Sequence, residues 1–307
     1  MDITANMVKE LREITDCGMM ECKKALVETD GNIEKAIDYL RERGIAKAEK
    51  KVGRIAAEGI VASYCHTDGT FVMAEINSET DFAAKSDAFK EFAKNILMQI
   101  AENKPADLEA LLSGKCLNDK SMDVNEYVKQ TIAKLSENVN IRRFVIYNKS
   151  DDSAIDSYIH AGGKIGVLVE LKFGGDKENA EFKQTVKNIA MQVAASNPQF
   201  LDRTEISADF IKKEREIQRA AAISEGKPEK IVDKMVDGRI EKYIKEICLV
   251  DQAYIIDPDI KVSEYLSNTG KALGSGISVK RFTRFERGEG IQKKEENFAE
   301  EVAKQIK

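Results

Sequence analysis

Residues 87–101 read DAFKEFAKNILMQIA and residues 180–194 read AEFKQTVKNIAMQVA, so one segment of this chain is present in two copies. Upstream of each segment lies a Ser-Tyr-x-His tetrapeptide, at 63–66 and at 157–160, and these hold the only two histidines of the sequence. Each copy is therefore predicted to run strand, hairpin turn, strand, connection and helix. The residues that recur are Phe89, Lys90, Lys94, Asn95, Ile96, Met98, Gln99 and Ala101, which correspond to Phe182, Lys183, Lys187, Asn188, Ile189, Met191, Gln192 and Ala194.

The two copies differ most in the connection between the second strand and the helix. This connection reads NSETDFAAKSD in the first copy and KFGGDKENAE in the second. Where two related units agree, we expect the shared residues to hold the fold. Where they differ, we expect one unit to have acquired a function of its own, which directs attention to residues 80–83.

Length and charge limit the classes of protein to consider. A chain of 307 residues predicts two or three domains. Lys and Arg total 48 against 53 for Asp and Glu, so the net charge is -5. A surface of this charge repels phosphate backbones, which argues against nucleic acid as a direct partner.

The sequence also argues against a membrane or secreted protein. No apolar run approaches the length of a transmembrane helix, and the N-terminus MDITANMVKELRE is acidic where a signal peptide is basic. We therefore expect a cytoplasmic protein without a membrane partner. The cysteines are odd in number and scattered without a C-x-x-C pair, which predicts reduced, mostly buried thiols rather than disulfides or a zinc site. They are Cys17, Cys22, Cys65, Cys116 and Cys248.

The N-terminal part predicts a small three-helix bundle. Three apolar helical patterns occupy residues 2–43, with Gly18 and Gly31 between them. Gly44 follows the third pattern and is predicted to end that helix. Residues 45–54 are basic, and a solvated linker or an extension of the third helix is favoured there over a phosphate-binding patch.

The two copies and their flanking segments predict the remaining elements. The first copy has a hairpin turn at 67–69, helices at 87–101 and 125–136, and a strand at 140–147; the second has a turn at 161–163, a strand at 165–173 and a helix to 195. Residues 277–282 read as a strand, and a charged helix is predicted from about Lys293.

Residues 205–249 predict an antiparallel helical hairpin. Its reversal is Gly226-Lys227-Pro228. The apolar face of this hairpin rests either on its own core or on another subunit, and the second alternative would give a homodimer. The predicted apolar stripes consist of Phe210, Ile217 and Ala221 in the first helix and of Ile231, Met235, Ile240, Ile244 and Ile247 in the second.

The motifs of covalent chemistry are missing from the sequence. It holds no G-x-x-x-x-G-K-[ST] loop, no H-E-x-x-H pair and no G-x-S-x-G elbow, and the glycines at 162–166 lie in a hairpin turn. For His66 and His160, which occupy equivalent hairpin positions, a structural or surface role is favoured over catalysis. We therefore predict no catalytic residue, no metal site, no cofactor and no enzyme activity.

Residues 80–83, Thr80-Asp81-Phe82-Ala83, are the candidate binding residues. Phe82 either folds into the local core, which the sequence alone favours, or points outward as a wedge. Asp81 has an alternative interpretation as the cap of the following helix. Because the second copy lacks both the acid and the aromatic residue, the pair indicates insertion into a partner.

Several motifs, in order along the chain, resemble the bacterial elongation factor Ts family. They are GMMECKKAL at 18–26, TDFAAK at 80–85, NIRR at 140–143, GKP at 226–228 and RFERGEG at 284–290, and the resemblance covers essentially the whole length. It implies a guanine-nucleotide exchange factor that binds elongation factor Tu with GDP, displaces its magnesium ion and promotes GDP release, so that GTP can bind during translation elongation. The alternative is a non-catalytic binding or scaffold protein built on the repeated units.

The resemblance also implies an α+β fold with five parts. These are an N-terminal UBA-like three-helix bundle with its linker (1–54), two related α+β core subdomains with antiparallel sheets (55–147, and 148–204 with 250–270), a protruding antiparallel helical hairpin (205–249) and a C-terminal module (271–307).

The resemblance assigns residues to partner binding as well. Thr80, Asp81, Phe82 and Ala83 correspond to the loop that enters the nucleotide-binding domain of elongation factor Tu and dislodges its magnesium ion. Arg12, Met19 and Met20 are expected to bind that same domain, and His160 to contact a different domain of the partner. The resemblance assigns no role to His66.

Overall fold

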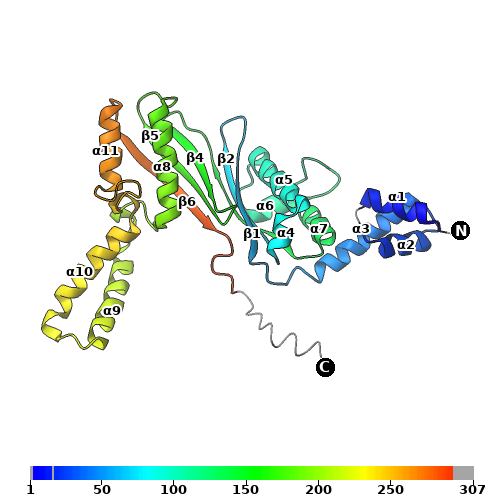
Figure 1. Ribbon diagram of the computed structural model, residues 1–307, viewed down its shortest axis with the longest axis horizontal. Coiled ribbons are helices and arrows are strands. Elements are labelled where there is room, and N and C mark those ends of the chain that lie inside the picture. Colours follow the sequence, from blue (N-terminus) through cyan, green and yellow to red (C-terminus); the bar gives the residue numbers. More distant parts are fainter. Residues whose placement is uncertain (1–2, 16, 293–307) are drawn as a thin grey trace. The chain divides into compact units, whose positions relative to one another are not determined.

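A computed structural model describes residues 3–15 and 17–292 of the chain, and these residues form two compact units (Figure 1). Of the described residues, one unit takes in those up to His66, Val72–Ile146 and 286–292, and the other takes in Thr67–Phe71 and Tyr147–Phe285. The α+β class with two small antiparallel sheets is confirmed. The finer five-part division and the UBA-like character of the N-terminal helices stay predictions.

The N-terminal part is a three-helix bundle, as predicted. Its helices are α1 (Ala5–Thr15), α2 (Met19–Glu28) and α3 (Ile33–Glu49). Gly18 precedes α2 as its N-cap residue, and Gly31 turns the chain before α3 at a φ of 81° that favours glycine. The buried core of the bundle consists of Val8, Leu11, Cys22, Ala25, Leu26, Ala36 and Leu40.

Gly44 does not end the third helix, contrary to the prediction from the sequence. Helix α3 continues to Glu49, so the alternative of a helical extension is the correct one. The glycine serves a contact instead: a Cβ atom at Gly44 would lie 3.1 Å from the Cβ of Ala133 in helix α7 (Val124–Leu135). The missing side chain therefore lets α3 lie close against α7.

The first sheet is the core of the first copy. Its strands follow the order β1 (Glu58–Cys65), β2 (Phe71–Ser78) and β3 (Val139–Tyr147). Helix α5 (Asp87–Asn103) packs on β1, while the short helices α4 (Asp81–Lys85) and α6 (Leu108–Ser113) lie before and after it. The core between the sheet and the helices includes Val72, Ala74, Ile76, Phe89, Phe92, Ile96 and Ile100.

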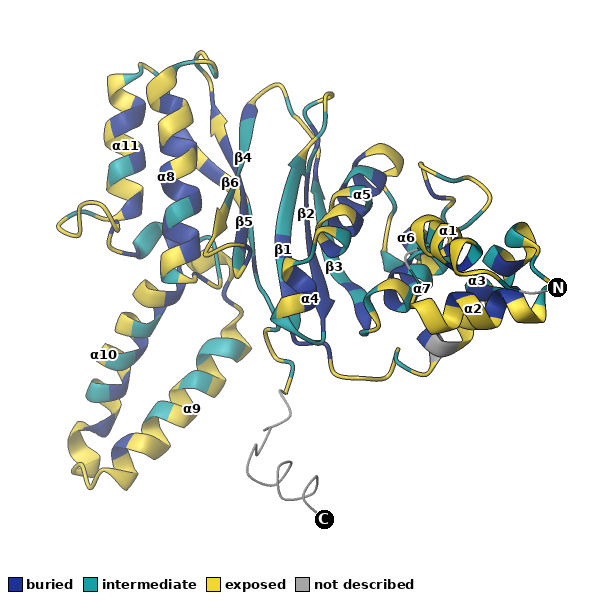
Figure 2. Ribbon diagram, turned by 45° about the vertical axis from the view of Figure 1, so that its right-hand side comes forward, coloured by how far each residue is buried: buried dark blue, intermediate teal, exposed yellow. Residues whose placement is uncertain are grey.

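The second sheet repeats this plan. Strand β4 (Ser153–His160) pairs antiparallel with β5 (Ile165–Phe173), with His160 opposite Ile165. Helix α8 (Ala180–Ser196) packs on both strands and α11 (Val262–Ala272) lies beside α8; Figure 2 shows buried and exposed segments alternating along both helices. The core includes Val167, Val169, Leu171, Phe182, Val186, Ile189 and Val193.

Strand β6 (Ile277–Glu286) completes the second sheet beside β5. It lies in the stretch 271–307 that the resemblance assigned to a C-terminal module. Ile277 and Val279 alternate with exposed residues and join the core of the second copy, which explains why this segment pairs with β5. The charged helix predicted from Lys293 lies outside the described residues.

The recurring polar residues of the repeat make equivalent hydrogen bonds in the two copies. The Asn95 Nδ2 atom donates to the hydroxyl of Tyr127 at 2.9 Å, and the Asn188 Nδ2 atom donates to that of Tyr265 at 3.0 Å. Gln99 accepts from the amide of Leu117, and Gln192 accepts from that of Ile255, each at 2.8 Å. These bonds tie each long helix to the segment that follows it, so the residues recur for the fold.

These pairs also show where the second copy carries an insertion. Asn95 and Asn188 are 93 positions apart, whereas their partners Tyr127 and Tyr265 are 138 apart, so the second copy has 45 additional residues. They form the predicted helical hairpin of α9 (Ala208–Ser224) and α10 (Glu229–Ile247), which pack side by side (Figure 1). Short 3-10 turns, Arg203–Glu205 and Leu249–Asp251, flank it.

The apolar stripe predicted for the hairpin is partly wrong. Ile217, Ala221 and Ile231 are exposed, whereas Ala222, Val232 and Val236 are buried. The helices are thus rotated by about one residue from the predicted face at this end. Nearer the sheet, Ile240, Ile244 and Ile247 are buried as predicted.

Candidate partner-binding site

Thr80 begins the short helix that carries the candidate residues. Its side chain accepts a hydrogen bond from the amide of Ala83 at 3.2 Å, which makes Thr80 the N-cap residue of α4. Asp81 is the first residue within this helix, so its alternative interpretation as a helix cap is wrong. The second copy has no such helix, because Gly174 and Gly175 follow its second strand.

Phe82 points into solvent. Its side chain is 82% exposed, while Ala83 and Ala84 on the other side of the helix are buried. The inward orientation that the sequence alone favours is therefore wrong, because the two small alanines fill the space beneath α4. The ring of Phe82 is therefore accessible from outside the chain.

Asp81 lies next to Phe82 and is ionised. The ammonium group of Lys85, one helical turn on, lies 2.6 Å from its carboxylate. This hydrogen bond holds the pKa of Asp81 below its ordinary value. The helix thus presents an aromatic ring and a paired carboxylate together.

The base of α4 is fixed by residues just before β3. Both donors of Thr80 reach Glu137: its amide lies 2.9 Å from one carboxylate oxygen and its hydroxyl 2.7 Å from the other. In the reverse direction, the amide of Asn138 donates to Glu79 at 2.6 Å. No sequence motif marks Glu137 as part of this site, because only its position in space connects it to Thr80.

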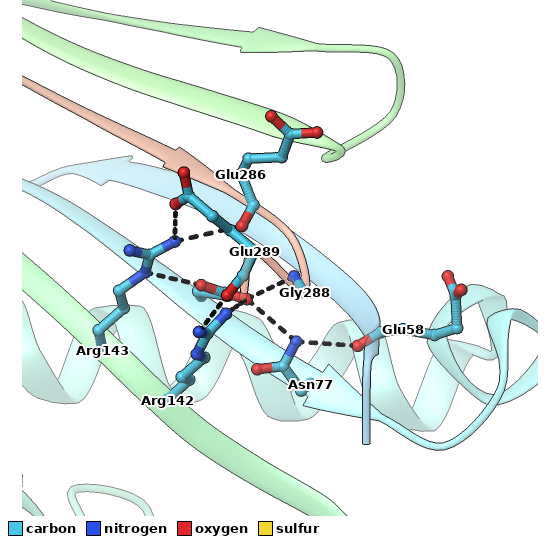
Figure 3. A network of polar contacts seen from close by, with 8 residues as sticks. Glu58, Asn77, Arg142, Arg143, Glu286, Gly288 and Glu289 are labelled. Carbon is cyan, nitrogen blue, oxygen red and sulfur yellow. Dashed lines mark hydrogen bonds and ion pairs between the residues drawn. The ribbon is translucent and has the colours of Figure 1, made fainter. Parts of the chain in front are cut away.

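Asn77, Arg142, Arg143 and Gly288 belong to one network of polar contacts in the first unit (Figure 3), and Glu75 is its acceptor. Glu75 of β2 is fully buried and accepts from Arg142 at 2.9 Å, from Arg143 at 2.7 Å and from the amide of Gly288 at 2.7 Å. Burial alone would raise the pKa of Glu75, but the Gly288 amide, the two guanidinium groups and Asn77 outweigh it, so the pKa lies below its ordinary value.

Glu170 of β5 has the same surroundings in the second copy. It is fully buried and bonded to Lys280 at 2.9 Å, Arg281 at 2.6 Å and Ser153 at 2.5 Å. The sequence carries a signal for both carboxylates: a glutamate interrupts an apolar strand in both copies, and the third strands read IRRF and VKRF. The NIRR and RFERGEG motifs thus hold the fold around the site.

The chain is similar to known proteins over most of its length. The family model described as "Elongation factor TS" matches residues 79–289. The chain is 52% identical over 305 residues to elongation factor Ts of Clostridium novyi (strain NT), with 99% of each chain covered. It is 50% identical over 305 residues to that of Clostridium tetani (strain Massachusetts / E88), again with 99% of each chain covered.

The chain belongs to the elongation factor Ts family. The resemblance inferred from the separated motifs is therefore confirmed. Membership in the elongation factor Ts family makes the chain a translation elongation factor, active in protein biosynthesis.

The remaining residues that the resemblance to elongation factor Ts assigned to partner binding are exposed. Arg12 lies in the last turn of α1, and Met19 and Met20 begin α2, with side chains 50% and 75% exposed. His160 lies at the end of β4 in the other unit, and its ring nitrogen is 3.0 Å from the hydroxyl of Tyr158. His66, by contrast, pairs with Glu102 at 3.1 Å.

Other expectations concern metals, membranes and thiols. Across residues 3–15 and 17–292, His, Cys, Asp and Glu side chains form no group of three that could hold a metal ion. In the same part of the chain, helices of sufficient length and apolar character to cross a bilayer are absent. Cys22, Cys116 and Cys248 are buried thiols as predicted, and burial raises the pKa of each.

Proposed function

We propose that this protein is a guanine-nucleotide exchange factor that binds elongation factor Tu with GDP, displaces its magnesium ion and promotes GDP release, so that GTP can bind. The observation that carries the proposal is the exposed ring of Phe82 beside the ionised Asp81, on a helix anchored at its base. Because the ring is already exposed and α4 is already anchored, Phe82 can enter a partner as a wedge without any refolding of the chain that carries it.

The mechanism acts on the site that holds GDP in the partner. Loop amides bind the phosphates of GDP, and magnesium bridges phosphate and protein. Phe82 would push between the elements that support this site, while the carboxylate of Asp81 would disturb the water and ligand shell of the ion. Magnesium and then the phosphate contacts would be lost.

One side chain is insufficient for fast exchange. Burying a phenylalanine contributes roughly 1.5–3 kcal/mol. Accelerating GDP release by about 10⁴-fold requires about 5.5 kcal/mol. Further contacts must therefore hold the partner in its distorted state, and the exposed Arg12, Met19, Met20 and His160 are the proposed sources.

The first test is Phe82→Ala, with release of labelled GDP from elongation factor Tu followed by stopped flow. We expect release at saturating protein to slow by roughly 10- to 100-fold, since the lost burial is worth roughly 1.5–3 kcal/mol. Thermal unfolding should not change, because the ring is exposed. The matched control is Ile256→Ala, which shortens another exposed apolar side chain. Release at the unchanged rate would refute the wedge.

A scaffold protein is the alternative, and catalysis separates it from an exchange factor. A scaffold binds its partner stoichiometrically, whereas an exchange factor accelerates release of many GDP molecules at substoichiometric concentration. Linkage gives a second criterion: if this protein weakens nucleotide binding, GDP and GTP must each weaken its own binding by the same factor.

We also propose a partner other than nucleic acid, a cytoplasmic location and a homodimer. The net charge of -5 supports a partner other than nucleic acid, and a translation factor is expected in the cytoplasm. A homodimer through the helical hairpin is supported by exposed isoleucines on α9 and α10, at 217, 223 and 231.

A further inference from the structure

The internal repeat provides a control for the residues around α4. Positions in the segments after the long helices correspond at a separation of 138, so Glu137 and Asn138 of the first copy match Ser275 and Gly276 of the second. The copy with the Thr-Asp-Phe-Ala sequence thus has Glu-Asn directly before its third strand. The copy without that sequence has Ser-Gly at the same place. A residue that only holds the shared fold would be expected in both copies.

We infer that Glu137 is a positioning residue for Phe82, acting through Thr80; this inference rests on the proposed function. Thr80 donates both its amide and its hydroxyl hydrogen to the carboxylate of Glu137, at 2.9 Å and 2.7 Å. A hydroxyl has one hydrogen, so this donation leaves its lone pairs to accept from the amide of Ala83. Glu137 therefore fixes the direction of the helix cap and with it the first turn of α4.

Asn138 extends the anchor to the segment after α3. Its side-chain amide is buried and donates to the carbonyl oxygens of Val52 at 3.1 Å and Arg54 at 2.7 Å, while its backbone amide donates to Glu79. The helix that carries Phe82 and the exit from the N-terminal bundle therefore share one attachment point. Hydrogen bonds to a carboxylate are about twice as strong as neutral ones. The bonds to Glu137 and Glu79 therefore suit a helix that must keep its position when Phe82 enters the partner.

The second copy is built differently at the corresponding positions. A Cβ atom at Gly174, which follows β5, would lie 2.7 Å from the hydroxyl oxygen of Ser275. Gly174 and Ser275 therefore lie close together in the second copy, and Ser275 stands at the position of Glu137. The short helix and its carboxylate anchor are thus present or absent together.

The test is Glu137→Gln in the full chain, with GDP release from elongation factor Tu measured over a range of protein concentrations. The new amide keeps one acceptor but turns an NH₂ donor toward the donors of Thr80. We expect release at saturating protein to fall about tenfold, while the concentration for half-maximal release stays unchanged. Glu102→Gln is the matched control, since that carboxylate pairs with His66 in the same unit. Loss of affinity without loss of the saturated rate would overturn the inference.

A second background separates positioning from general stability. If Glu137 acts through Phe82, then Glu137→Gln should slow GDP release less in the Phe82→Ala background than in the unaltered chain, where the ring is present. An equal slowing by Glu137→Gln in both backgrounds would show that it acts independently of the ring. Should Phe82→Ala itself leave release unchanged, the proposed function fails, whatever Glu137 does.

A spectroscopic readout needs no partner. The sequence contains no tryptophan, so Phe82→Trp introduces a single indole at the tip of α4. We expect Glu137→Gln to lower the fluorescence anisotropy of that indole, and Glu102→Gln to leave it unchanged. If Glu137→Gln prevents folding, Thr80→Val tests the same contact from the other side, with Thr80→Ser as the variant that restores it. Equal anisotropy in these pairs overturns the inference.

Discussion

Glu75 and Glu170 are carboxylates without exposed surface, each placed within a sheet and held by two cations of the third strand. Such a group is stabilised only while its partners remain, because an unpaired charge in a low-dielectric environment is costly. At Glu75 the same contacts also bind the chain at Gly288, so this residue connects β2, β3 and the segment after β6.

Replacing Glu75 should therefore destabilise the protein strongly. For Glu75→Gln we expect the free energy of unfolding in urea to fall by about 3 kcal/mol, since Arg142 and Arg143 both lose the buried carboxylate, although Arg143 keeps its pair with Glu289. The exposed Glu109→Gln serves as control and should change it by less than about 0.5 kcal/mol. A loss at Glu75 no larger than at Glu109 would contradict this account.

The same residues predict sensitivity to acid. The pKa values of Glu75 and Glu170 are lowered in the folded protein from an ordinary 4.5. A lowered pKa contributes stability that is fully present above the unfolded value and is lost as pH falls through the folded one. Unfolding free energy should thus decline below about pH 4.5, and Glu75→Gln should flatten the decline. Urea titrations at several pH values test this, and equal slopes in the two proteins would speak against it.

At the scale of elements, two helical glycines behave differently because their neighbours differ. Gly238 in α10 has open space around its Cβ position, whereas a Cβ at Gly44 in α3 would meet Ala133. The glycine at Gly238 only lowers the stability of its helix, whereas the glycine at Gly44 allows α3 and α7 to approach each other.

Gly238→Ala should accordingly stabilise the helical hairpin by about 0.5–1 kcal/mol. Hydrogen exchange of the amides in α10 is the measurement, and slower exchange is expected. Gly226→Ala, at a φ of 75° in the reversal, should have the opposite effect, since alanine is strained there. No change in protection at α10 would show that helix propensity does not limit the hairpin.

The elements were predictable from the sequence where local pattern decides them. The repeated helices, the hairpins and the helical hairpin follow from apolar periodicity and turn residues, and the structure has them within a few positions. The prediction that Gly44 ends a helix is wrong because the helix that it contacts lies far along the chain. The direction of Phe82 and the partner of Thr80 depend on packing in space, which periodicity does not record.

For the molecule as a whole, the repeat distinguishes what folding needs from what has been added. The first copy connects its long helix to its third strand without a hairpin, through α6 and α7. The 45 additional residues of the second copy are thus dispensable for its sheet, as the offset between equivalent hydrogen bonds indicates.

Deleting residues 207–247 and joining the ends with a short Gly-Ser linker should leave a folded protein. We expect self-association or affinity for elongation factor Tu to decrease, while the GDP release rate at saturating protein is retained, because α4 lies in the other unit. Sedimentation and stopped flow are the two measurements. An unaltered sedimentation profile together with lost exchange would reverse this assignment.

The ends of the insertion meet: Phe200 pairs with Cys248, and the amide of Leu249 donates to the carbonyl of Phe200 at 2.9 Å. Any foreign domain whose termini are neighbours could be spliced in at this point without stretching the host sheet. A fluorescent reporter placed there would let the factor be followed in living cells without a tag at either end of the chain.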